Sequence, residues 1–200
     1  MKRTWPGWIL CVLTVALLAY MATVQGPEIS ASIGGLYLPD AVPLGYGTEA
    51  AAALHQAFVS EAAKAQATGL RSASAAYVAM HAGSDLLFPP MLAASLAFAG
   101  FAALNSRRNQ AGSPLSARIG LGLVLALAFA YLGCDYVENA VADAMFGLPS
   151  LSRAFNAQLV PVLRGLTAAK FLTGALALML IVALWIGRWR AGRKPAGETV

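Results

Sequence analysis

The sequence predicts an all-α membrane protein: four transmembrane helices in a bundle, with an extramembrane loop and an amphipathic helix between the first and the second. Of the 200 residues, 58% are hydrophobic, and the mean hydropathy is +0.65. Only 12% are charged, whereas soluble domains carry about 25%. Four runs without a charged residue cover positions 4–27, 86–106, 119–134 and 171–187, close to the ~17–25 residues that a span requires.

The first transmembrane helix is expected over residues 1–26. Lys2 and Arg3 precede its apolar run, as they would in a signal peptide, but the run is long and no clean small-residue cleavage motif follows it. The segment is therefore predicted to remain as a signal anchor.

Residues 27–70 are expected outside the membrane, as a loop followed by an amphipathic helix. Seven Pro and Gly residues between positions 27 and 47 favour the loop. The helix should begin near Thr48 and end near Gly69. Leu54 and Phe58 lie one turn apart and give it an apolar side, so it would either rest on the membrane surface or cap the bundle.

Residues 71–190 are expected to hold the other three transmembrane helices. Pro89 and Pro90 should interrupt the second, because each removes a backbone donor and leaves the carbonyl four residues earlier without its usual partner. The third should end near Ala144, and the fourth should open near Pro161. A row of small residues on the third helix is expected to permit close helix packing: Gly122, Ala126, Ala130 and Cys134.

The basic residues predict that both termini face the cytoplasm. Nine of the 14 lie at the N-terminus, between the second and third spans, or after the fourth: Lys2, Arg3, Arg107, Arg108, Arg118, Arg188, Arg190, Arg193 and Lys194. The positive-inside rule then gives an N-in, C-in topology, which we place in a bacterial cytoplasmic (inner) membrane, with residues 191–200 as a cytoplasmic tail. These anchors explain the net charge of +5, and no nucleic-acid partner is expected.

The most informative stretch follows the third apolar run. Its D-x-x-E-N pattern places Asp135, Glu138 and Asn139 on one face of a helix. Counted at the helical rise from the basic anchors, Asp135, Asp85 and Lys170 lie about 24–32 Å from the cytoplasmic side, against a hydrocarbon thickness of about 30 Å. Ionisable side chains at that depth are costly and need a partner or a function.

These side chains form a candidate polar cluster that faces outward. Its predicted members are Tyr77, His81, Asp85, Asp135, Glu138, Asn139 and Lys170. Lys170 is expected to pair with Asp135 or Glu138, with Asp85 as the second choice, and Arg164 is expected within reach. One interpretation is a structural network that fixes helix register. The other is a binding site, because three carboxylates against one lysine leave excess negative charge for a proton, a cation or a substrate amine. The carbonyls before the prolines would then help to coordinate a cation.

No cofactor or metal is predicted, and no catalytic residue is assigned. Haem ligation by two histidines would need a membrane partner for His81, but His55 lies in the extramembrane segment. A metal site built from His81, Asp85 and Glu138 is a weak pattern. No C-x-x-C pair occurs, and no phosphate loop or Ser-His-Asp spacing stands out.

Several features together resemble an uncharacterised family of small four-helix bacterial inner-membrane proteins. They are listed here in chain order: Pro39 and Asp40 followed by Gly45 and Tyr46; Tyr77 before the D-x-x-F-P motif of Asp85, Phe88 and Pro89; the D-x-x-E-N motif of Asp135, Glu138 and Asn139; and Lys170 at the start of the last helix. The resemblance spans residues 37–172. It differs where the family has an adjacent Gly-Arg pair, because Leu70 separates Gly69 from Arg71 here. It implies the four-helix architecture and the polar cluster, and no reaction.

Three functions fit the sequence, which does not choose among them. The first is a membrane protein without enzymatic activity, whose cluster is structural or binds a partner or ligand. The second is a small cation- or proton-coupled carrier, which would need a homodimer because the chain has no second half related to the first. The third is a membrane-embedded hydrolase or transferase acting on lipid at the outer leaflet, with a carboxylate as general base. The expected partners are the lipid bilayer and either a second copy or another membrane protein.

Overall fold

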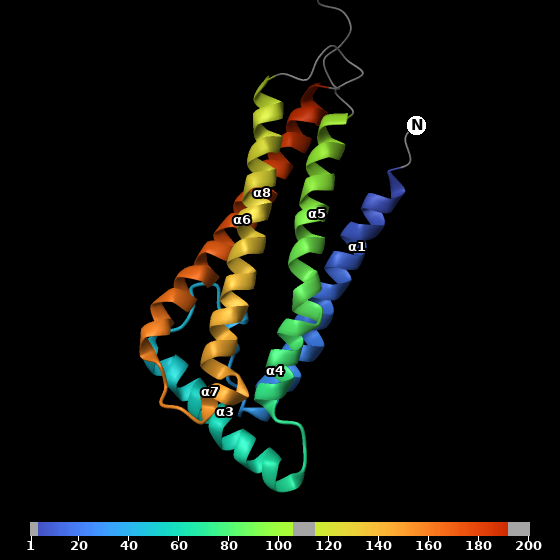
Figure 1. Cartoon of the computed structure of the whole chain (residues 1–200). Coiled ribbons are helices and arrows are strands. Elements are labelled where there is room, and N and C mark those ends of the chain that lie inside the picture. The colour runs from blue at the N-terminus through green and yellow to red at the C-terminus, as the bar shows by residue number, and fades with distance from the viewer. Residues whose placement is uncertain (1–3, 106–114, 192–200) are drawn as a thin grey trace, which may run out of the picture.

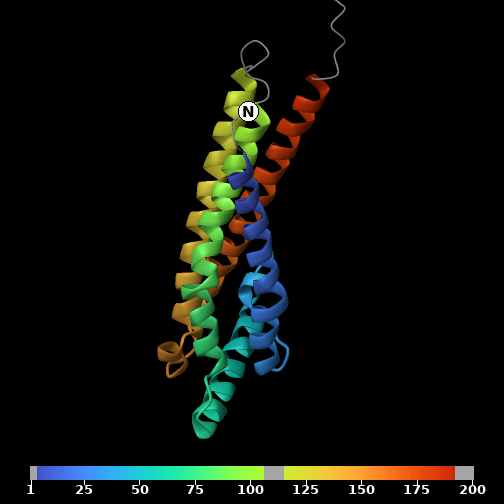
Figure 2. The ribbon, with the colours of Figure 1, turned by 90° about the vertical axis from the view of Figure 1, so that its right-hand side faces the viewer.

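Every regular element is helical in the computed structural model, which describes residues 4–105 and 115–191. Four helical runs are long and apolar enough to cross a membrane: Trp5–Ser32, Ala73–Leu104, Arg118–Phe146 and Ala157–Arg190. Figures 1 and 2 show them as an elongated bundle. The predicted fold class is therefore confirmed. The connection that carries Arg107 and Arg108 and the tail over 192–200 lie outside the described residues.

The first run extends beyond its predicted end. Helix α1 (Trp5–Tyr20) continues through a π turn, η1 (Met21–Gln25), into α2 (Gly26–Ser32). Pro27 lies in the first turn of α2, where a missing N–H costs little. In the π turn the Gly26 N–H bonds the Met21 carbonyl, five residues back, and this wider turn carries the chain past the proline without ending the helix. The predicted boundary at residue 26 therefore moves to Ser32.

The second run is interrupted at a different place from the one predicted. Helix α4 (Ala73–Ala82) ends at Gly83, which has φ −114° and ψ −101°, and α5 (Ser84–Asn105) then continues through Pro89 and Pro90. A proline ring crowds the carbonyl four residues earlier. For Pro89 that carbonyl belongs to Asp85, in the first turn of α5. The distortion therefore falls on the turn before the prolines, and the prediction that they break the helix themselves was wrong.

The third and fourth spans follow their predicted limits. Helix α6 (Leu115–Phe146) ends before Gly147, and a short α7 (Leu148–Leu151) and a 3₁₀ turn, η3 (Ala157–Leu159), lead to α8 (Val160–Ala191). Helix α6 packs along α8 and α5, and α1 packs against α5. The row of small residues on α6 does not make these contacts: Gly122, Ala126 and Ala130 are exposed and Cys134 is half-buried.

The amphipathic segment caps one end of the bundle. A loop with a 3₁₀ turn, η2 (Pro39–Ala41), leads into α3 (Thr48–Thr68). Gly69 ends α3 with a left-handed φ of 68°, as its sequence position predicted. Helix α3 buries Leu54, His55 and Phe58 and packs against α4, α6 and α7. It crosses the end of the bundle opposite the N-terminus (Figure 1), which is called the α3 end below.

Two apolar cores lie along the bundle. The core at the α3 end includes Leu54, Phe58, Tyr77, Met80 and Phe146. The other, called the inner core, joins α5, α6 and α8 and contains Leu96, Val124, Ala128, Ala177 and Ile181. On α6 the D-x-x-E-N motif lies between the residues of the two cores.

Candidate functional site

Six polar side chains gather where α5, α6 and α8 meet. They are called the membrane polar cluster and comprise Asp85, Asp135, Glu138, Asn139, Thr167 and Lys170. Spacings of three and four residues bring the α6 members to one face, and a spacing of three does the same for the two α8 members. All six are buried, with Asp135 and Glu138 only 1% and 0% exposed.

Lys170 is held between two carboxylates of α6. Its Nζ lies 3.1 Å from Asp135 Oδ1 and also contacts Glu138 Oε2. The expected pairing with these two residues is therefore confirmed. Asp85, the second choice as a partner for Lys170, bonds Asn139 instead. Arg164, the other cation expected within reach of the carboxylates, donates from Nε to the Leu44 carbonyl at 3.0 Å.

Asp85 and Asn139 connect α5 to α6. The Asn139 amide donates from Nδ2 to Asp85 Oδ2 at 2.7 Å. This hydrogen bond comes from a neutral amide, so it stabilises the Asp85 carboxylate without neutralising its negative charge. The remaining amide oxygen, Asn139 Oδ1, is buried without a hydrogen-bond partner.

Thr167 is a member of the cluster that sequence reasoning missed. Its hydroxyl lies 2.5 Å from Glu138 Oε1 and 2.9 Å from the Leu163 carbonyl. Its place three residues before Lys170 was the available signal, because this spacing puts both on one helical face.

The cluster carries more negative charge than its lysine can balance. With all groups ionised, three carboxylates and one ammonium leave a charge of −2, taken as 1 − 3 over Asp85, Asp135, Glu138 and Lys170. Asp135 Oδ2 is also buried without a hydrogen-bond partner. Buried uncompensated charge is strongly unfavourable. The site therefore has both the charge and the unpaired oxygens to accept a cation or protons.

Tyr77 and His81 belong to a separate group closer to the α3 end. His81 Nδ1 lies 2.6 Å from Asp143 Oδ1, and its Nε2 lies 3.6 Å from Asp40 Oδ2. The Tyr77 hydroxyl donates to Asp40 Oδ2 at 2.9 Å. These four residues are called the His81 group. The single predicted cluster is thus divided into two neighbouring sets.

The His81 group includes two carboxylates that were not among the predicted site residues. Asp143 lies one turn beyond Asn139 on α6, so helical spacing offered a signal for it. Asp40 lies in η2 and was noticed only as part of a resemblance motif. Burial alone would raise the pKa of Asp40, but the hydrogen bond and charge of His81, followed by the charge of Lys170, lower it to about 2. Asp40 is therefore ionised at neutral pH.

The prolines of α5 do not leave a free carbonyl at Leu86. The Tyr136 hydroxyl donates to the Leu86 carbonyl at 2.9 Å. Tyr136 is 38% exposed, so this bond lies at the edge of the bundle. This hydrogen bond uses one lone pair of the Leu86 carbonyl, and its expected help in coordinating a cation stays a prediction.

The arrangement of acids and histidines differs from the metal pattern considered from the sequence. His81 contacts Asp40 and Asp143, rather than Asp85 and Glu138. Within the described ranges, no group of three or more His, Cys, Asp or Glu side chains is placed to hold a metal ion. Cys11 and Cys134 are free and half-buried.

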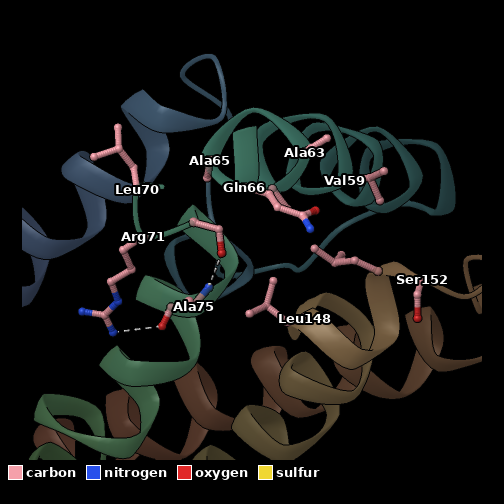
Figure 3. A pocket seen from close by; sticks show the side chains of 12 residues that line it. Val59, Ala63, Ala65, Gln66, Leu70, Arg71, Ala75, Leu148 and Ser152 are labelled. Atoms are coloured by element: carbon pink, nitrogen blue, oxygen red, sulfur yellow. Dashed lines mark hydrogen bonds between the residues drawn. The ribbon is translucent and has the colours of Figure 1, made fainter. Parts of the chain in front are cut away.

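Two hollows lie near the α3 end. Figure 3 shows one of about 570 Å³ between α3, the start of α4 and α7, lined mainly by alanine and other apolar residues. Arg71 lies at this hollow and donates to the Ala75 carbonyl at 3.0 Å. The other, of about 440 Å³, lies between α1, α2 and η2, and Asp40 lines it. Of these two hollows, only the second is lined by a member of the His81 group.

Comparison with known proteins assigns no family to this geometry. No protein-family model, curated protein or solved structure matches the chain.

Proposed function

We propose that this multi-pass membrane protein binds a cation in its membrane polar cluster, a proton in preference to a metal ion, because the described carboxylates are not placed as a group of three or more to hold a metal. One observation carries the proposal: the cluster holds three buried carboxylates and one lysine, which contacts two of them, while Asp135 Oδ2 and Asn139 Oδ1 have no hydrogen-bond partner. A purely structural network would be expected to pair its charges and its hydrogen bonds.

The position of each group supports this role. Lys170 neutralises one charge of the Asp135 and Glu138 pair. Asp85 has the amide of Asn139, a neutral group, as its hydrogen-bond partner among the described residues. A bound cation or proton would reduce the remaining negative charge, and the unpaired oxygens are the hard ligands that small cations favour.

Binding from the α3 end is favoured over passage through the membrane. The inner core, which includes Val124, Ala128 and Ala177, fills the bundle on the other side of the cluster. A carrier would have to open this core. The cation-coupled carrier is therefore the less favoured alternative.

A lipid-acting enzyme that uses His81 as its general base is also less favoured, because of the contacts of His81. A general base needs a free nitrogen to receive a proton. Asp143 and Asp40 lie opposite the two ring nitrogens of His81, at 2.6 and 3.6 Å. This arrangement suits an ion-paired imidazole better than a general base that removes a proton from the substrate or from water.

The orientation follows from the basic residues. The ends of α1, α5 and α8 near the N- and C-termini lie together, opposite α3 (Figures 1 and 2). We place that end in the cytoplasm of a bacterial inner membrane, because nine of the 14 Lys and Arg residues lie at or near it in the sequence. The polar cluster would then be reached from the outer side.

The proposal is tested by thermal unfolding of the purified protein in detergent. Melting is compared in choline, sodium and potassium chloride at constant ionic strength, from acidic to mildly alkaline pH. A ligand that binds only the folded state raises the midpoint, by about 2.7 kcal/mol of stability at 100 times its Kd. If an alkali cation binds, sodium or potassium raises the midpoint relative to choline. If a proton binds, acidification raises it and the salts are equivalent.

Two variants assign the effect to the cluster. Asp85→Asn removes one carboxylate charge from the site and should reduce the dependence on the cation or on pH. Glu49→Gln removes an exposed carboxylate from α3 and should leave it unchanged. If Asp85→Asn responds to salts and pH as the wild type does, the cluster is not a cation site.

A further inference from the structure

The hollow beside Asp40 supports a second binding site, separate from the membrane polar cluster. We infer that the cavity between α1, α2 and η2 binds a phospholipid with a primary-amine headgroup, of the phosphatidylethanolamine type, through the carboxylate of Asp40.

The cavity has the size and lining of a small-molecule site. Its volume is about 440 Å³, and ligand pockets generally hold about 300–1,000 Å³ with mainly apolar walls and a few placed polar groups. Leu18, Met21, Ala22 and Met80 are among its apolar walls, and Asp40 is its only charged lining residue.

The place of the cavity along α1 matches the boundary of a bilayer. Counted from Trp5 at the helical rise, Leu18 lies about 20 Å along the helix and Pro27 about 33 Å, whereas the hydrocarbon core is about 30 Å thick. Leu18 and Ala22 are also exposed on the side of the bundle. A lipid could therefore enter sideways, with its chain beside Leu18 and its headgroup near the α2 level.

The carboxylate gives the cavity its chemical preference. Asp40 Oδ2 accepts a hydrogen bond from Tyr77 at 2.9 Å and lies 3.6 Å from His81 Nε2, whereas Asp40 Oδ1 is buried without a hydrogen-bond partner. A primary ammonium offers a positive charge and three N–H donors, so it would satisfy this oxygen. The quaternary ammonium of phosphatidylcholine has the charge without a donor, and phosphatidylglycerol has hydroxyl donors without a positive charge.

The experiment measures which lipid stays bound. The purified, delipidated protein is mixed with phosphatidylethanolamine, phosphatidylcholine or phosphatidylglycerol of equal chain length, and retained lipid is counted by native mass spectrometry. We expect at least about tenfold preference for phosphatidylethanolamine, since a hydrogen bond to a charged group corresponds to about that factor or more. Equal retention of the three lipids would overturn the inference.

Three variants locate the site. Asp40→Asn should abolish the preference, whereas Glu28→Gln, on an exposed carboxylate of α2, should keep it. Ala22→Trp should lower phosphatidylethanolamine retention by filling the cavity, which tests the site even if Asp40→Asn folds poorly. A preference that survives both Asp40→Asn and Ala22→Trp would place the lipid elsewhere. Asp85→Asn should leave lipid retention unchanged, so the two proposed sites can fail independently.

Discussion

Replacing Lys170 with methionine should destabilise the protein strongly. Lys170 is 6% exposed, and its ammonium forms ion pairs with both Asp135 and Glu138. Methionine keeps most of the side-chain volume but removes the charge and the donors. The variant would leave two carboxylates buried in the membrane without their cation.

The size of the effect follows from the contact distances. At the 3.1 Å between Lys170 Nζ and Asp135 Oδ1, the attraction between unit charges is about 5 kcal/mol at an effective dielectric constant of about 20. Desolvation offsets part of it, and truncating one partner of a buried pair costs about 3–5 kcal/mol. At roughly 2–4 °C per kcal/mol for a chain of this size, the melting midpoint should fall by roughly 6–20 °C.

Thermal unfolding in detergent measures the loss, and double-mutant cycles assign it. Adding Asp135→Asn or Glu138→Gln to Lys170→Met should recover part of the stability, because each removes a stranded charge. Lys64→Met provides a control on an exposed lysine of α3 and should change stability by less than about 0.5 kcal/mol. If the losses from Lys170→Met and both carboxylate variants simply add, these residues are not energetic partners and the reasoning fails.

Further predictions concern topology, cofactor content and acid stability. Single cysteines at Ser60 and Ser150 should react with an impermeant thiol reagent on intact cells and one at Ser113 should not; labelling at Ser113 would reverse the proposed orientation. No haem should copurify, because His81 has no histidine partner at membrane level; a Soret band that disappears in His81→Ala would contradict this. The pKa of Asp40 is held at about 2, below its usual 3.8, so its ionised form stabilises the fold above that usual value. This contribution, about 2 kcal/mol, is lost as the pH falls through about 2. Acid titrations of unfolding should therefore show a shallower loss for Asp40→Asn than for the wild type, and equal losses would exclude this role.

The spans could be predicted because the bilayer imposes a simple condition on the chain. Backbone groups in hydrocarbon must be paired internally, so long apolar runs become helices. Breakers outside the apolar runs were also informative: α3 ends at Gly69, and Pro161 lies in the first turn of α8. Prolines inside the apolar runs were less informative. The helix continues past Pro27, and the second span breaks at Gly83, before its run begins, rather than at Pro89 and Pro90.

The face that each helix presents to its neighbours could not be predicted as well. The row that includes Gly122 and Ala126 on α6 is exposed, while Val124 and Ala128 pack in the inner core. A lipid tail is about as apolar as a leucine side chain, so hydropathy does not distinguish the lipid face from the packed face.

Polar residues in the spans do carry that information, since an ionisable group must face a partner rather than lipid. The sequence by itself therefore determined the four-helix class and the inward face of the D-x-x-E-N motif, and it identified Lys170 as a partner for Asp135 and Glu138. Only the tertiary structure decided that Asp85 bonds Asn139, that Thr167 reaches Glu138, and that His81 lies apart from Lys170. It also brought Asp40 from a loop to Tyr77 and His81. Helical spacing relates residues within one helix, whereas these contacts depend on how separate segments pack and on where an irregular loop returns to the bundle.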